Sequence, residues 1–181
     1  APLAAPDDLD GFVRRLAEPL AVIHELVLPT TTAIPPYRPY DIDLARRGEL
    51  APPRRARDPA VWERAIAVHV GPAPGSRAVF LHRDYHPGNV LWHGGRVSGV
   101  VDWVNASRGP NDADIGHCRY NLALGFGLEI ADRFLAAHRA LTGEPEYHPY
   151  WDIVSAVGML PEFEEREEPA EEFVARAIAA L

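Results

Sequence analysis

Apolar and polar residues follow a helical period at the start of the chain. Apolar side chains recur every three or four positions between residues 7 and 27, which predicts an amphipathic helix. Pro19 lies inside this pattern and should kink or split the helix, because its ring removes a backbone donor. Residues 28–57 are rich in Pro and Arg and keep no period, so we expect a long irregular connection with one short helix near 41–48.

The period changes in the middle of the chain. A helix is predicted from Asp58 to about His69, because an N-cap residue is followed by a first-turn proline. Short apolar runs then replace the helical pattern, at 78–81, 89–92 and 97–103. The tight turn at Gly94-Gly95 between the last two runs predicts a β-hairpin.

Helical spacing returns in the last third of the chain. The predicted helices cover residues 113–124, 129–142, 149–160 and 169–180. A length of 181 residues is typical of one domain. We therefore expect a mainly α protein of the α+β class, in which helices surround a small central β-hairpin that carries the polar residues.

Composition excludes several kinds of chemistry. All 18 basic residues, counted without histidine, are arginines, so the chain itself supplies neither a Schiff-base lysine nor a phosphate-binding lysine. Cys118 is the single cysteine, which excludes an internal disulfide and a cysteine-rich zinc module. The apolar runs are shorter than the ~18 residues that a membrane span requires. We expect a cytoplasmic protein without a membrane partner.

Negative charge is concentrated at the C-terminal end. The formal net charge is −8, and residues 144–181 carry ten acidic residues against two arginines. The rest of the chain is neutral, so the basic surface of a nucleic-acid-binding protein is absent. The acidic end is typical of a solvated helix surface, and it also suits a cationic substrate.

The candidate chemistry lies between residues 82 and 102. A polar loop that contains Pro87-Gly88 follows the first apolar run, and the bend lets Asp84 and Asn89 face one cavity. A hairpin would return Asp102 to the same end of the sheet. Asn89 and Asp102 offer the oxygen ligands that suit Mg²⁺ bound to phosphates, and Asp84 can accept a proton from an attacking hydroxyl. These residue types together favour phosphoryl transfer.

The same residues resemble a known family. The string from His82 to Leu91, followed by Val101-Asp102-Trp103, resembles the catalytic and metal-binding loops of the aminoglycoside phosphotransferase and choline kinase branch of protein-kinase-like folds. The segment from Gly109 to Ile115 is also similar, and the resemblance covers nearly the whole chain. Arg83 departs from the pattern, since this branch more often has Gly there, and leaves open how accessible the outer face of the loop is.

The resemblance implies a role for each matching residue. Asp84 is implied as the catalytic base or hydroxyl-orienting group, and Asn89 and Asp102 are implied as Mg²⁺ ligands. His82 and Asp114 are implied as structural polar anchors that hold the loop. His86 is implied as loop support through a hydrogen bond within the loop, or as a group that lines the site. Arg108 follows the metal loop closely enough to reach a phosphate or an acidic substrate group, and it suits a surface position equally well.

The resemblance also implies what lies outside the chain. The 181 residues correspond to a single C-terminal lobe, and the N-terminal lobe with its nucleotide-binding loop and lysine is absent from it. The chain begins with Ala1, so we expect a processed form or part of a longer protein. The expected cosubstrate is ATP or another nucleoside triphosphate with Mg²⁺. The expected acceptor is a small-molecule hydroxyl, as in an aminoglycoside, sugar or amino alcohol.

Two alternatives remain open from the residues. A catalytically inactive pseudokinase, acting as a binding module, would keep the fold without the reaction. A metal-dependent hydrolase would use His82, Asp84 and His86 as ligands, although a catalytic zinc site usually has further His or carboxylate ligands. Asp84, Asn89 and Asp102 each also suit a turn or a strand end. Their joint occurrence at this spacing favours the phosphotransferase.

Overall fold

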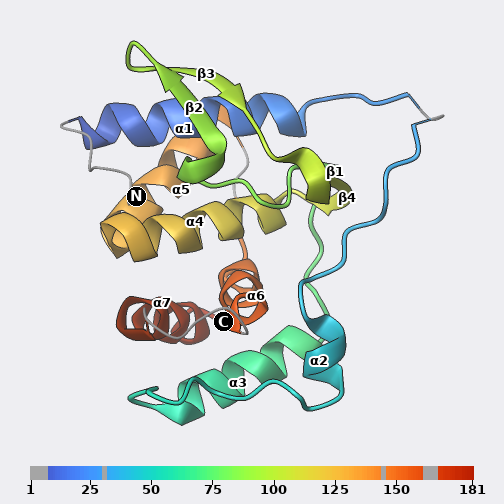
Figure 1. Ribbon diagram of the computed structural model, residues 1–181, viewed down its shortest axis with the longest axis vertical. Helices are drawn as coiled ribbons and strands as arrows, with labels where there is room; N and C mark the ends of the chain where they lie inside the picture. The colour runs from blue at the N-terminus through green and yellow to red at the C-terminus, as the bar shows by residue number, and fades with distance from the viewer. Residues whose placement is uncertain (1–7, 30–31, 144–145, 161–166) are drawn as a thin grey trace.

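The computed structural model describes residues 8–29, 32–143, 146–160 and 167–181 (Figure 1). The helices of these residues are α1 (Leu9–His24), α2 (Ile42–Arg46), α3 (Pro59–Val70), α4 (Asp112–Phe126), α5 (Leu128–Thr142), α6 (Tyr150–Gly158) and α7 (Glu167–Ala179). The strands are β1 (Ala78–Leu81), β2 (Val90–His93), β3 (Arg96–Val100) and β4 (Ser107–Pro110), with short 3₁₀ helices η1 (Pro87–Asn89) and η2 (Trp103–Asn105). The predicted mainly α member of the α+β class is confirmed.

The helices are stacked with α4 at the centre. Figure 1 shows α1 and the β2–β3 hairpin at one end, α4 and α5 below them, and α2 and α3 at the far end. α4 packs against α5, α6 and α7, and it is buried on nearly every side. A Cβ on Gly116 would lie 2.5 Å from the carbonyl oxygen of Trp151, so glycine allows α4 and α6 to approach closely. Polar side chains of α4 therefore need partners inside the protein.

The first helix differs from the prediction at its proline. α1 begins at the N-cap Asp8, whose carboxylate accepts a hydrogen bond of 2.7 Å from the backbone of Gly11. It continues without interruption through Pro19 to His24, so a split at the proline is wrong. Leu16 and Leu20 are fully buried in the core on either side of the proline. Burial of this face stabilises the helix more than the missing backbone hydrogen bond weakens it.

The strands form two antiparallel pairs, β1 with β4 and β2 with β3. β2 and β3 form the predicted hairpin around Gly94-Gly95, both of which have positive φ. β1 pairs with β4, a strand that the sequence pattern does not indicate because Ser107–Pro110 has no apolar alternation. The third predicted strand ends at Val100 instead of 103, since Asp102 adopts the left-handed conformation at φ 66°.

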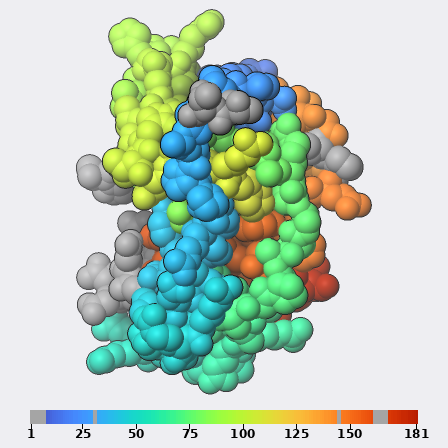
Figure 2. Space-filling view, turned by 90° about the vertical axis from the view of Figure 1, so that its right-hand side faces the viewer, coloured from blue at the N-terminus to red at the C-terminus, as the bar shows by residue number. Residues whose placement is uncertain are grey.

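The irregular connection after α1 crosses one face of the molecule. In Figure 2 the blue part of the chain runs down this face between the hairpin and α2. The backbone N–H of Tyr37 donates to the carbonyl of Arg108 over 2.8 Å, and the N–H of Arg108 donates to the carbonyl of Pro35 over 2.9 Å. Residues 35–40, here called the 35–40 segment, are thereby attached to β4 beside the polar loop. None of the helices in the described ranges has the length and hydropathy to span a membrane.

Candidate active site

The polar loop between β1 and β2 is anchored from below by α4. The buried carboxylate of Asp114 accepts hydrogen bonds from the backbone N–H groups of His82 (2.8 Å) and Arg83 (2.6 Å). His24 on α1 contacts the same carboxylate through Nε2 at 3.2 Å. Charge-assisted hydrogen bonds of this kind are stronger than neutral ones. Asp114 thus joins α1, α4 and the start of the loop.

His82 connects the loop to the segment that carries Asp102. Its Nε2–H donates to the carbonyl of Val101 over 2.8 Å, and its Nδ1 accepts from the backbone N–H of Asp84 over 3.2 Å. The two partners require one tautomer, with the proton on Nε2. The imidazole also packs against the Trp103 ring, with ring centres 4.5 Å apart. His82 therefore sets the position of Asp84 relative to Asp102.

The carboxylate of Asp84 is held on both oxygens. His117 on α4 donates through Nε2 to Oδ1 over 3.0 Å, and the side-chain amide of Asn89 donates to Oδ2 over 3.1 Å. The hydrogen bond from His117 is the main cause that lowers the pKa of Asp84 to about 2, and partial burial opposes it. The charges of His117 and His86 and the Asn89 amide act in the same direction as that bond. Asp84 is thus ionised at neutral pH, as a proton acceptor must be.

Asn89 and Asp102 lie at the same end of the β2–β3 hairpin, as the sequence predicts. Val90 pairs with Val100, and the N–H of Val101 donates to the carbonyl of Asn89 over 2.9 Å. The Asn89 amide nitrogen also donates to the Asp84 carbonyl over 2.8 Å, which directs that nitrogen away from any metal. Asp102 is exposed directly beyond the hairpin. One amide oxygen and one open carboxylate are hard oxygen donors that fit Mg²⁺.

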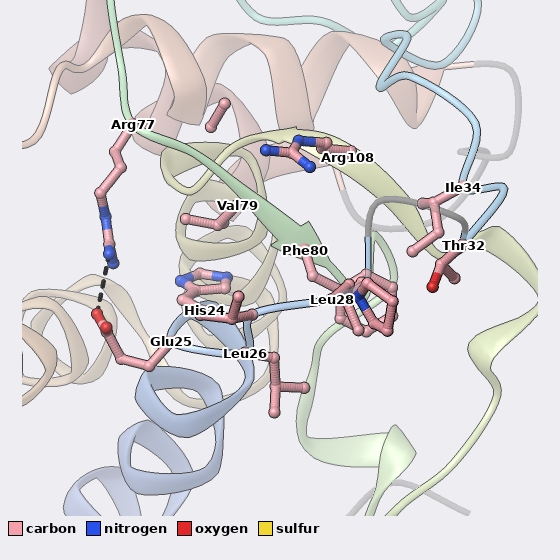
Figure 3. A pocket seen from close by; sticks show the side chains of 13 residues that line it. His24, Glu25, Leu26, Leu28, Thr32, Ile34, Arg77, Val79, Phe80 and Arg108 are labelled. Carbon is pink, nitrogen blue, oxygen red and sulfur yellow. Dashed lines mark hydrogen bonds and ion pairs between the residues drawn. The ribbon is translucent and has the colours of Figure 1, made fainter.

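Two predicted residues lie at the edges of this arrangement. His86 accepts a hydrogen bond of 3.1 Å from Gly88 on Nδ1, and its Nε2 lies 3.8 Å from Oδ1 of Asp84. Burial is the main cause that lowers the pKa of His86. Arg108 lies on β4 and lines a different cavity of about 310 Å³, together with the ion-paired Arg77 and Glu25 (Figure 3).

The described residues contain no site that fits the zinc hydrolase alternative. Both ring nitrogens of His82 are already engaged, one with Val101 and one with Asp84. Within residues 8–29, 32–143, 146–160 and 167–181, no group of three or more His, Cys, Asp or Glu side chains is arranged to hold a metal. The structure therefore gives His82, Asp84 and His86 no shared zinc.

His117 is a site residue that sequence reasoning did not assign. Its side chain is 7% exposed and reaches Asp84 from α4, 33 residues along the chain. The available signal is its spacing from Asp114, because residues three apart share one face of a helix. Once Asp114 is recognised as the anchor of the loop, His117 is expected on the same side of α4.

The side chain of Arg83 covers part of the outer face of the loop, where it contacts the 35–40 segment. It has φ 72°, a conformation that glycine adopts more readily than arginine. Its guanidinium donates to the carbonyl of Arg38 over 2.6 Å and lies 5.0 and 4.3 Å from the ring centres of Tyr37 and Tyr40. Such cation–π contacts compensate for part of the strain. Arg83 therefore attaches the 35–40 segment to the outer face of the loop.

Part of the acidic C-terminal end has a structural role. The carboxylate of Glu171 on α7 accepts from the backbone N–H groups of Arg57 (2.9 Å) and Asp58 (3.0 Å), at the start of α3. Trp62 adds an indole N–H at 3.3 Å. Glu168 pairs with the Arg57 guanidinium at 2.8 Å. Glu164 and Glu165 lie outside the described residues, so the predicted attraction for a cationic acceptor stays a prediction.

Comparison with known proteins places this geometry in context. Residues 2–151 match the model of a family described as the phosphotransferase enzyme family. A macrolide 2′-phosphotransferase type I is 24% identical with a TM-score of 0.61, and the match covers 97% of this chain and 60% of that one. A choline/ethanolamine kinase family protein from Mesorhizobium loti is 16% identical (TM-score 0.58, 94% and 61% covered). An aminoglycoside-3′-phosphotransferase of type VIII is 17% identical (0.56, 96% and 64%).

The comparisons also show how much of each relative the chain covers. The chain spans less than two thirds of the length of each of these three solved structures. No curated protein sequence matches it. At these identities the structural similarity establishes the fold, which this chain shares with the three solved structures.

Proposed function

The chain belongs to the phosphotransferase enzyme family, and from this premise we propose that it is the C-terminal lobe of a small-molecule kinase. Its reaction would transfer the γ-phosphoryl group of ATP, or of another nucleoside triphosphate, to a hydroxyl group. The observation that supports this most is the ionised Asp84 carboxylate beside Asn89 and Asp102, all at one end of a hairpin. Phosphoryl transfer depends mainly on positioning and on neutralised charge, and these residue types supply both.

Asp84 receives the acceptor hydroxyl in this proposal. Oδ1 is held by His117, while Oδ2 accepts from Asn89 and keeps a second lone pair for the hydroxyl proton. As the hydroxyl oxygen bonds to the γ-phosphorus, the bond from phosphorus to the β–γ bridging oxygen breaks and the nucleoside diphosphate leaves. The hydroxyl proton moves to Oδ2. A positioned base contributes about 10²- to 10⁴-fold to such a step.

Asn89 and Asp102 are the residues that would hold Mg²⁺. The Asn89 amide nitrogen is directed to Asp84, which assigns its oxygen to the metal side. Asp102 adds one negative charge on an exposed turn. Mg²⁺ bound in protein sites of this kind neutralises phosphate charge and retains several waters, so two protein ligands are sufficient.

A second lobe is part of the proposal. Apolar side chains stand exposed on and just beyond the β2–β3 hairpin, with Leu91 48%, Val101 38% and Val104 85% accessible. Apolar groups gathered beside a polar site are typical of a surface that a ligand or a neighbouring domain covers. A nucleotide base and an N-terminal lobe would cover this surface, and that lobe would supply the lysine that these 181 residues lack.

The acceptor is proposed only as a hydroxyl-bearing small molecule. The printed names of the similar structures include macrolide and aminoglycoside phosphotransferases and a choline/ethanolamine kinase family protein. Each of these names implies a compound that carries free hydroxyl groups. Aminoglycosides, macrolides and amino alcohols are therefore the first acceptors to test.

The test is an Asp84→Ala variant of the full-length protein, assayed for nucleoside diphosphate release with a panel of these acceptors. We expect turnover to fall by about 10³-fold or more, because the hydroxyl loses its proton acceptor. Asp10→Ala is the matched control, since Asp10 is exposed and pairs only with Arg133 among its described contacts. Turnover that survives in Asp84→Ala contradicts the base assignment. Ligand binding without turnover in the wild-type protein favours the pseudokinase alternative.

A further inference from the structure

His117 stands apart from the other buried histidines because its ring contacts the carboxylate of Asp84, on which the proposed reaction depends. The histidine on α3 (His69) and the one on α5 (His138) are buried and have pKa values lowered to about 4, chiefly by desolvation. His117 is similarly buried, yet its Nε2 lies 3.0 Å from Oδ1 of Asp84. An ionised carboxylate only accepts hydrogen bonds, so Nε2 of His117 must carry the proton in this contact.

His117 is held in place by its position in the middle of α4. Its backbone carbonyl accepts a hydrogen bond of 3.0 Å from the side chain of Asn121, one turn further along the helix. One turn earlier, Asp114 holds the backbone of the loop that carries Asp84. The backbone of this loop and the carboxylate of Asp84 are therefore both hydrogen-bonded to the same helix, α4. Within its own loop the Asp84 carboxylate is hydrogen-bonded only on Oδ2, by the Asn89 amide, so the contact from α4 adds a second fixed point that restricts rotation about the side-chain bonds.

From this geometry we propose that His117 is a positioning residue for phosphoryl transfer, which fixes Oδ1 of Asp84 so that Oδ2 is left to the acceptor hydroxyl. The inference rests on the proposed function, since it assigns a role within the same site. Small misplacements of a reacting group lower rates strongly, by about 10²-fold for 1 Å. The hydrogen bond from α4 restricts Asp84 to one orientation before the acceptor arrives.

The experiment compares three variants of the full-length protein. His117→Leu removes the donor, His117→Gln retains a side-chain N–H, and His138→Leu removes a buried histidine from α5 as the matched control. We expect His117→Leu to lower kcat by about 10- to 100-fold with KM for the nucleotide unchanged. His117→Gln should recover part of this loss, and His138→Leu should keep the wild-type kcat and KM.

A second readout does not depend on turnover. The ¹³C resonance of the Asp84 carboxyl, measured by NMR at neutral pH, should shift in His117→Leu relative to the wild type, because the carboxylate loses the hydrogen bond from Nε2. An unchanged resonance, or an unchanged kcat, overturns the positioning role. If Asp84→Ala retains turnover while the resonance still shifts in His117→Leu, the contact is real and the proposed base is wrong. The two failures are thereby distinguished.

Discussion

At the scale of single residues, the site depends on buried polar groups with several partners each. Asp114 is the clearest case, because its carboxylate serves two backbone N–H groups and one imidazole. Its side chain is fully buried, so water cannot replace any of these contacts. Each buried donor left without an acceptor lowers the free energy of unfolding by about 1–3 kcal/mol. Asp114 therefore determines the geometry of the loop and also stabilises the fold.

Asp114→Ala should lower the free energy of unfolding by about 3–5 kcal/mol, because it leaves a buried set of donors unpaired. Urea denaturation of the full-length protein at neutral pH measures the effect. Asp10→Ala removes an exposed carboxylate that is paired with Arg133, and it should change the same quantity by less than about 1 kcal/mol. Equal effects of the two substitutions would contradict the anchoring role of Asp114.

At the scale of elements, packing decides where local preferences disagree with the fold. Pro19 stays within α1 although it removes a hydrogen bond, because α1 packs along α5 and buries an apolar face. β4 exists because its backbone pairs with β1 and with the 35–40 segment, not because its side chains favour a strand. Backbone groups that are buried must be paired, whatever the local sequence.

Pro19→Ala tests this balance directly. The substitution restores the backbone donor in the middle of α1, so we expect the free energy of unfolding to rise by about 1–2 kcal/mol. Thermal denaturation should show a correspondingly higher Tm. Pro59→Ala is the matched control, because Pro59 lies in the first turn of α3, where no intrahelical donor is needed. A lower Tm for Pro19→Ala would show that the proline is favourable where it stands.

At the scale of the whole molecule, the proposed function makes the described residues one half of a site shared by two lobes. Asp84 and the proposed metal ligands lie at one end of the β2–β3 hairpin, beside exposed apolar side chains. The chain contains no lysine, so under this proposal the lysine that usually contacts the α- and β-phosphates belongs to the second lobe. Residues 1–181 alone should therefore bind a nucleotide poorly.

Isothermal titration calorimetry of residues 1–181 with Mg-ATP measures this directly. We expect a dissociation constant above about 1 mM, which corresponds to less than about 4 kcal/mol of binding free energy. The matched sample is the full-length protein under the same conditions, which should bind in the micromolar range. Micromolar affinity of residues 1–181 alone would contradict the proposed division between two lobes.

The sequence predicted the helices, the hairpin and the neighbourhood of Asp84, Asn89 and Asp102, because these depend on local period and short spacing. It did not predict β4 or the continuity of α1 through Pro19, since both depend on contacts between distant segments. Among the site residues, His117 was missed for the same reason. Its partner lies 33 positions away, and no short motif joins them.

The amino-acid sequence by itself determined the fold class, the family resemblance and the residue types available for phosphoryl transfer. The tertiary structure alone decided which oxygen of Asp84 is held by α4, and that Arg83 attaches the 35–40 segment to the loop. It also decided that both nitrogens of His82 are engaged, which left no zinc site there. The physical reason is that hydrogen-bond partners are chosen by distance and burial in three dimensions, and sequence spacing does not contain them.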